Sequence, residues 1–518
     1  MNLTKAIAGL ALLAFPAAGS TDVRSLQNTA KEQQHHANRN FVGNSVWVFG
    51  GDGVTIFNPD GSEKKKEIAA NDICHEVIGY RGNPEAQTIC SFYDVISDGK
   101  KYVWAAVTRG VAKIDILDID TGDVVGSFET CTNPTQLEYH PLREEIWVRC
   151  SELHPNSETP TYMDVFSASS PSVSIETDVF FSSTFESGGN PASKGYTVVD
   201  NTLGDVGYIT DRDQPYIFKL DLSTKKVIDK FDLPLAYGGV DAAYSRVNKH
   251  IYVRSDVCCT CGFEGADALV CPGRYTAELV NVTTGNQAGQ NNVLGACFWR
   301  CHGYGADTLG VYEFDTTTDT IVGSHLMKEG FTGDPFPSPD GKYIVMIGRN
   351  GGSTIRVLKP GAASEKSTLL YDLELKFNNT GNEDEDVFSD FAFVDLPDKN
   401  LLVFASGTEN KAAIIDLSDV ENPVYVVLKD DGESTARWGS SRDIEWAVGT
   451  HYVWIGGDDA DEIYVLDVMK KELVRTITEK SSSKILSVVN FEKMNAAKRQ
   501  QEMIDATIAS YVSGDSSS

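Results

Sequence analysis

Six of the ten cysteines lie within residues 256–305, in the order CC-x-C, then C, then C-x3-C followed directly by His302. Such thiols could form disulfides, bind a metal as thiolates or carry a covalent haem. The paired C-x2-C spacing of zinc sites is absent, and CFWRCH has one residue more than the C-x-x-C-H haem motif, so no haem is expected. A disulfide-bonded subdomain is favoured over a thiolate metal site, and the cysteines concerned are Cys258, Cys259, Cys261, Cys271, Cys297 and Cys301.

Four aspartates form a second group that could do chemistry. Asp241, Asp334 and Asp443 precede short apolar strands in nearly the same register, and Asp390 stands two residues earlier in its own unit. If these units surround an axis, the carboxylates converge and repel one another unless they are protonated or bridged by a cation. We therefore predict that two or more of them hold calcium or another divalent cation. The alternative is that each caps the start of its own strand and faces solvent.

Motifs for nucleophilic or nucleotide chemistry are absent. The chain has no G-x-S-x-G elbow, no H-E-x-x-H and no phosphate-binding glycine loop, so no nucleotide is expected. His75, between Cys74 and Glu76, could be a base or an incidental loop histidine. His140 and His250 stand beside strand turns, which favours a structural role. The acidic run at 382–390 lacks the glycine and glutamate of an EF-hand and is expected to be a solvated loop.

The elements that must position these residues recur along the chain. One is a short strand rich in β-branched and aromatic residues. The other is an apolar residue, an aspartate, a polar turn and two apolar residues, as in LDIDTGDVV, LDLSTKKVI, FDTTTDTIV and LDVMKKELV. The first occurs as SVWVFG, YVWAAV, EIWVRC, VGYIT, HIYVRS, YIVMIG, LLVFAS and YVWIGG. One unit thus reads as four antiparallel strands joined by tight turns, which is the organisation of a β-propeller blade.

Eight such strands predict an all-β closed propeller of eight four-stranded blades, with seven as the alternative. The first unit lacks its leading strand, and the spare strand KILSVVNF (484–491) is expected to supply it and so remove exposed strand edges. Over residues 44–491 the pattern resembles the YVTN-type and WD-type propeller repeats, although the Gly-His to Trp-Asp signature of WD repeats is absent. This resemblance implies a fold and no particular activity.

Propeller geometry also predicts two disulfides outside the Cys-rich insertion. The loop that leaves the second strand of a blade and the link between blades open on the same face. Cys150 ends a second strand and Cys131 lies in the preceding link, so we expect them to pair. Cys74 and Cys90 share the long first link (70–93) and could staple it.

Segments outside the ring have compositions of their own. Residues 1–20 read as a secretory signal peptide, with Lys5 before a short apolar run and small residues for cleavage. Residues 21–43 read as a mobile leader, and 492–518 as a short helix with a polar tail. No apolar run is long enough for a transmembrane helix. An even cysteine count and the glycosylation sequons at Asn281 and Asn378 agree with a secreted or cell-surface protein.

The net charge of −29 makes nucleic acid and anionic membranes poor partners. Two classes of function remain open. The favoured one is a non-catalytic binding protein that presents one loop-elaborated face to an extracellular ligand, glycan or protein. The other is an exported propeller enzyme, a lactonase-type hydrolase or metal-dependent oxidoreductase, with carboxylates at the channel mouth.

Overall fold

The computed structural model describes residues 44–490 with internal gaps. Those gaps are 79–84, 108–110, 132, 151–162, 171–173, 177–195, 211–215, 234–238, 256–261, 265–267, 271–310, 326–332, 349–353, 376, 378–390, 406–409, 430–441, 458–461 and 479–483. Asn44–Glu492 forms one compact unit. The predicted signal peptide, leader and C-terminal helix lie outside the described residues, as do Asn281, Asn378 and the six cysteines of the insertion.

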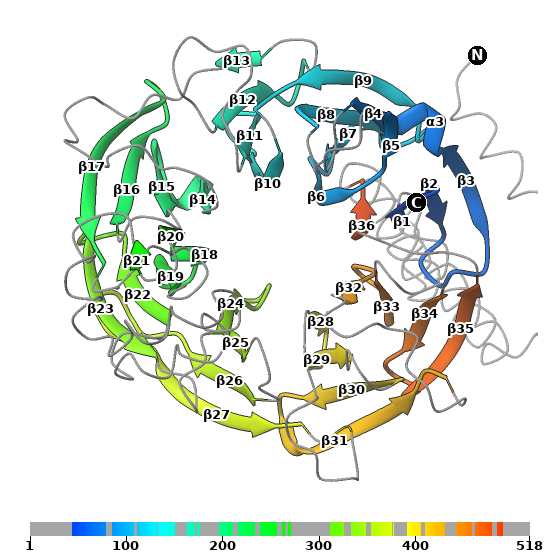
Figure 1. Ribbon diagram of the computed structural model, residues 1–518. Helices are drawn as coiled ribbons and strands as arrows, with labels where there is room; N and C mark the ends of the chain where they lie inside the picture. The colour runs from blue at the N-terminus through cyan, green and yellow to red at the C-terminus, as the bar shows by residue number, and fades with distance from the viewer. Residues whose placement is uncertain are drawn as a thin grey trace, which may run out of the picture. The chain divides into compact units, whose positions relative to one another are not determined.

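Eight four-stranded antiparallel sheets make up this unit, so the predicted eight-bladed β-propeller is confirmed (Figure 1). The first four blades, each listed from its innermost strand, have the following bounds. Blade one is β36 (Lys484–Val489), β1 (Asn44–Gly50), β2 (Gly53–Phe57) and β3 (Lys64–Ala69); blade two is β6 (Phe92–Ser97), β7 (Tyr102–Val107), β8 (Lys113–Asp118) and β9 (Val124–Glu129); blade three is β10 (Pro134–His140), β11 (Glu145–Cys150), β12 (Met163–Ser167) and β13 (Ser174–Glu176); blade four is β14 (Thr197–Val198), β15 (Val206–Thr210), β16 (Tyr216–Asp221) and β17 (Lys226–Asp232).

The other four blades repeat this order. Blade five is β18 (Gly239–Ser245), β19 (His250–Ser255), β22 (Val311–Asp315) and β23 (Thr320–His325); blade six is β24 (Gly333–Pro337), β25 (Ile344–Gly348), β26 (Thr354–Lys359) and β27 (Thr368–Glu374); blade seven is β28 (Phe391–Leu396), β29 (Lys399–Ala405), β30 (Lys411–Asp416) and β31 (Asp419–Val427); blade eight is β32 (Arg442–Trp446), β33 (Tyr452–Gly457), β34 (Glu462–Asp467) and β35 (Glu472–Thr478).

Among the described residues, four short features lie outside the four-stranded sheets. Helix α3 (Ala70–Ile73) and the hairpin β4 (His75–Ile78) with β5 (Ala86–Ile89) lie in the link between blades one and two. The hairpin β20 (Gly262–Glu264) with β21 (Ala268–Val270) belongs to the predicted insertion, which does leave blade five between its second and third strands. A 3₁₀ turn, η2 (Asn201–Leu203), follows β14.

The strand missing from the first unit comes from the other end of the chain, as predicted. β36 pairs antiparallel with β1, with Asn44 opposite Val489 and Val48 opposite Ile485. Hydrophobic clusters also join every pair of neighbouring blades. The cluster between blades eight and one includes Val46, Trp454 and Ile463, all fully buried. Apolar side chains on both faces of the inner strands are therefore removed from water between adjacent sheets.

The recurring aspartate has a structural explanation in the turn between the third and fourth strands. Its carboxylate accepts backbone N–H groups two and three residues on, at 2.8 Å in both cases for Asp221. Asp467 accepts in the same way, at 3.1 and 3.0 Å. The fifth position of the turn is left-handed, with φ of 67° at Gly122, 56° at Lys225, 55° at Asp319 and 60° at Lys471. The repeated phrase therefore specifies a side-chain-capped turn rather than a catalytic site.

Antiparallel order places like connections together. The turns from first to second strand and from third to fourth strand lie at one end of the strands, which we call the hairpin face. The links between blades and the connections from second to third strand lie at the other end, the loop face. In Figure 1 the first strand of each blade lies toward the centre of the array and the fourth toward its outside.

Candidate functional site

The predicted aspartates share one row of the innermost strands. Asp241 lies opposite Arg254, Asp334 opposite Ile347 and Asp443 opposite Gly456, which are equivalent positions of three second strands. Asp390 and the side chains of Asp241 and Asp334 lie outside the described residues. The row contains a fourth aspartate that sequence reasoning missed, Asp94, which lies opposite Ala106 in blade two.

Asp94 stands one residue closer to its second strand than the other three aspartates of the row do. Asp94 precedes Trp104 by ten residues, whereas Asp443 precedes the equivalent Trp454 by eleven. A one-residue difference in hairpin length therefore hid the shared register. In the same row, blade three has Gln136 and blade one has Lys484, opposite Arg149 and Phe49.

Asp443 binds groups of the neighbouring blade. Its carboxylate accepts the backbone N–H of Ile485, and Lys484 Nζ lies 3.4 Å from Oδ1. Asp94 does the same for blade three, since it accepts the N–H of Leu137 at 2.7 Å. Gln136 exchanges two hydrogen bonds with the backbone of Thr197 in blade four, at 2.7 and 2.9 Å. These side chains bridge the innermost strands of adjacent blades, whereas the predicted alternative had each aspartate capping its own strand and facing solvent.

Electrostatics at this row are unusual. Burial raises the pKa of Asp94 to about 6, Lys484 and two backbone N–H groups oppose that rise, and the charge of Asp443 adds to it. Glu138 stands on β10, two residues after Gln136. Burial raises the pKa of Glu138 to about 8, and the negative charge of Asp94 adds to that rise. Two carboxyls of the channel wall are thus held in environments that disfavour their ionised forms.

No group of three or more His, Cys, Asp or Glu side chains suited to a metal occurs among the described residues. The structure shows Asp443 with a lysine partner, and it does not describe the side chains of the other three predicted ligands. The cation therefore stays a prediction. In the row itself, Lys484 already supplies a positive charge between blades eight and two.

Two of the three histidines considered as candidates have mainly structural contacts. His140 is buried and its Nδ1 accepts the N–H of Arg143 at 3.3 Å. His75 Nε2 lies 2.8 Å from Asp115 Oδ2, which joins the β4–β5 hairpin to β8. No hydroxyl or thiol nucleophile is recorded at either imidazole among the described contacts.

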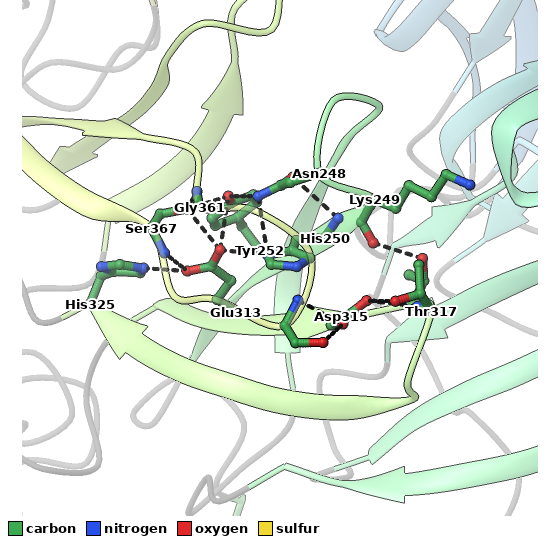
Figure 2. A network of polar contacts seen from close by, with 12 residues as sticks. Asn248, Lys249, His250, Tyr252, Glu313, Asp315, Thr317, His325, Gly361 and Ser367 are labelled. Atoms are coloured by element: carbon green, nitrogen blue, oxygen red, sulfur yellow. Dashed lines mark hydrogen bonds and ion pairs between the residues drawn. The ribbon is translucent and has the colours of Figure 1, made fainter.

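His250 belongs to a buried polar network between blades five and six (Figure 2). Glu313 Oε1 lies 2.6 Å from His250 Nδ1 and accepts from the Ser367 hydroxyl at 2.7 Å. Its Oε2 lies 2.8 Å from His325 Nε2 and accepts the Ser367 N–H at 2.8 Å. Burial opposes the charged form, but these hydrogen bonds outweigh it and hold the pKa of Glu313 well below its ordinary value.

This network contains serine, histidine and glutamate but is not a catalytic triad. In a triad the serine hydroxyl donates to histidine, whereas here Ser367 and both histidines converge on the carboxylate. Glu313 and His250 are fully buried, so a substrate has no access to them. The group fastens the seam between two blades.

Both predicted disulfides outside the insertion are present. Cys74 pairs with Cys90 and Cys131 with Cys150, with Cα–Cα distances of 4.8 and 5.7 Å. One staples the first link and the other ties the link before blade three to the end of β11. Both therefore reinforce the loop face.

Comparisons with known proteins bear on the fold. No known protein-family model matches the chain. The dihydro-heme d1 dehydrogenase NirN, solved in complex with DHE, superposes with a TM-score of 0.53 over 93% of this chain and 79% of its own, at 12% identity. AztD from Citrobacter koseri covers 74% of this chain and 83% of its own with a TM-score of 0.40 at 10% identity. The NirN superposition shows a likeness of fold alone. Within the described residues no helix is long and apolar enough to cross a bilayer.

Proposed function

We propose that this protein is exported and acts as a non-catalytic binding protein, which takes an extracellular ligand, glycan or protein on its loop face. The observation that carries the proposal is the placement of both described disulfides on that face. Disulfides are characteristic of oxidising compartments, and they rigidify connections that would otherwise move. A rigid face loses less conformational entropy when it binds.

The carboxylate row supports a cation in the same proposal. The structure describes the side chains of Asp94 and Asp443 in this row. The strand register places Asp241 of blade five and Asp334 of blade six in the same row. Calcium or another divalent cation would relieve the repulsion between these groups and could bridge to an anionic group of the ligand. Lys484 competes for the same charge, because it lies 3.4 Å from Asp443 and its charge lowers the pKa of Asp94.

Calorimetric titration with calcium tests the cation. Wild type should bind, Asp443→Asn should bind more weakly, and Lys484→Met should bind more tightly because the competing ammonium is gone. Asp229→Asn is the matched control, since Asp229 is an exposed aspartate of β17. Equal heats in all four proteins would exclude calcium from this row.

Binding itself is tested by presenting the purified protein to a glycan array with calcium and with a chelator. Selective capture that Asp443→Asn weakens supports the proposal.

The second candidate is an exported hydrolase. It is favoured by one observation, the neighbouring carboxyls Asp94 and Glu138 with pKa values of about 6 and about 8. Turnover of simple lactones that Glu138→Gln abolishes would replace the binding proposal with that enzyme.

A further inference from the structure

A cavity of about 490 Å³ opens along the innermost strands of blades three to six and the hairpin turns of blades five and six. Its wall includes Glu138 of β10 and Tyr244 and Ser245 of β18. The volume falls in the range of small-molecule sites. Neither described disulfide contributes to the part of the wall that the structure describes.

Glu138 gives this cavity an incompletely paired carboxyl. Among the described residues its one hydrogen bond comes from Gln136 Nε2, at 3.1 Å from Oε1. The charged groups that act on it are Asp94 of β6, Asp200 after β14 and Arg246 of the β18–β19 turn. Arg246 is engaged elsewhere, because its Nε lies 2.7 Å from Asp200 Oδ2. An anionic ligand would therefore disfavour ionisation of Glu138, whereas a cation would favour it.

A second observation points to a ligand with N–H donors. Ser245 is 1% exposed and lines the cavity, yet its hydroxyl has no hydrogen-bond partner in the described part of the chain. Buried hydroxyls without partners are uncommon and call for a water or ligand. The remaining wall is mixed: Tyr196, Tyr244 and Phe336 are aromatic, and the polar or charged residues are Asp200, Arg246, Ser338 and Asp340. Aromatic faces attract cations and pack against apolar groups.

We infer that this cavity binds an organic cation, an ammonium or amidinium group on an apolar body, with Glu138 as its counter-ion and Ser245 as a hydrogen-bond partner. The inference goes beyond the proposed function, since it uses neither calcium nor the loop face. In the binding step, the neutral Glu138 carboxyl loses its proton to solvent and the resulting carboxylate forms an ion pair with the bound cation.

Benzamidinium is the probe, because it stays protonated between pH 7 and 9, and benzamide is its neutral analogue. With a Glu138 pKa of about 8, about one-eleventh of the carboxyl is ionised at pH 7 and about ten-elevenths at pH 9. We expect affinity for benzamidinium to rise about tenfold over that range. Calorimetry in two buffers of different ionisation enthalpy should show release of nearly one proton at pH 7.

Three variants complete the test. Glu138→Gln should weaken benzamidinium binding at pH 9 at least tenfold and abolish proton release. Ala243→Leu, which fills the cavity without changing charge, should also block binding, so the result does not depend on one variant folding. Glu472→Gln, at an exposed glutamate of β35, should behave as wild type. No saturable binding at pH 9, binding unaffected by Glu138→Gln, or benzamide binding more tightly than benzamidinium would each overturn the inference.

Discussion

Two seams between blades use the same strand positions with different chemistry. Between blades three and four, Glu145 at the start of β11 binds Lys225 of the β16–β17 turn at 2.7 Å. Between blades five and six, the equivalent residue of β19 is His250, and it joins Ser367 of blade six through Glu313. One seam is closed by a lysine–glutamate pair and the other by a carboxylate that contacts a serine and two histidines.

The comparison shows that the propeller fixes where a seam contact must be made and leaves its chemistry open. In blades three and five, an aromatic residue stands two positions after Glu145 and His250, respectively, and takes part in the contact. In blade three, Trp147 Nε1 donates to Glu145 Oε2 at 3.2 Å, and Lys225 Nζ lies 5.0 Å from the centroid of the Trp147 ring. In blade five, the Tyr252 hydroxyl lies 2.7 Å from the Ser367 hydroxyl. Elsewhere Trp454 Nε1 donates to the Pro59 carbonyl at 2.8 Å across the seam between blades eight and one. The turn of one blade thus receives the aromatic residue of the blade before it.

Removal of Glu313 should have the largest effect. Glu313→Ala leaves His250, His325 and Ser367 buried without their acceptor, so we expect a loss of about 3–5 kcal/mol in unfolding free energy. Urea denaturation followed by tryptophan fluorescence measures it. Glu313→Gln keeps the shape and part of the hydrogen bonding and should lose less. If Glu313→Ala costs no more than an exposed substitution such as Glu472→Ala, the seam is not held by this carboxylate.

Acid should weaken the same seam. The native pKa of Glu313 lies below its unfolded value, so its charge stabilises the fold fully above about pH 4.3 and progressively less as the pH falls below that. The difference in unfolding free energy between wild type and Glu313→Gln should therefore be constant from pH 7 to pH 5 and narrow toward pH 3. A difference that stays constant to pH 3 would contradict this assignment.

The lysine seam should be less costly to open. Lys225→Met removes the ammonium that pairs with Glu145, while Arg143 Nε at 3.2 Å and Trp147 still bond that carboxylate. We expect a loss of about 1–3 kcal/mol. Lys471→Met is the matched control, because Lys471 occupies the same turn position with a similar φ and is exposed. That control should stay within about 0.5 kcal/mol of wild type, and equal losses in both variants would remove the role of the ion pair.

The sequence predicted the repeat well because each unit repeats the same local physics. Apolar second strands recur in every blade, and aspartate-capped turns recur in blades two, four, five, seven and eight. The spare strand at 484–491 pairs with β1 as expected. Disulfides Cys74–Cys90 and Cys131–Cys150 also followed from topology, since links and second-strand ends share a face.

The functional residues were harder to predict because they depend on contacts across blades. Asp94 was missed through a one-residue difference in hairpin length, and Glu138 was missed because nothing local to β10 marks a carboxyl whose pKa is raised by burial and by Asp94 of another blade. Glu313 carries no motif either. Its partners come from β19, β23 and blade six, and only the fold brings them together.

The smallest expected effect concerns the fifth turn position itself. Lysine at positive φ is strained, and Gly122 occupies the same position in blade two with φ of 67°. Because Lys471 is exposed, Lys471→Gly should relieve that strain and stabilise the protein by about 0.5–1 kcal/mol after the entropy of the unfolded glycine is subtracted. Lys225→Gly relieves the same strain but loses the ion pair with Glu145, so it should destabilise the protein. We therefore expect changes in unfolding free energy of opposite sign for Lys471→Gly and Lys225→Gly, measured by urea denaturation. That result would separate the backbone strain of the turn from the contact that its lysine makes across the seam. Stabilisation by both substitutions would mean that the lysine side chain of blade four adds nothing to its seam, and destabilisation by both would mean that the positive φ carries no relievable strain.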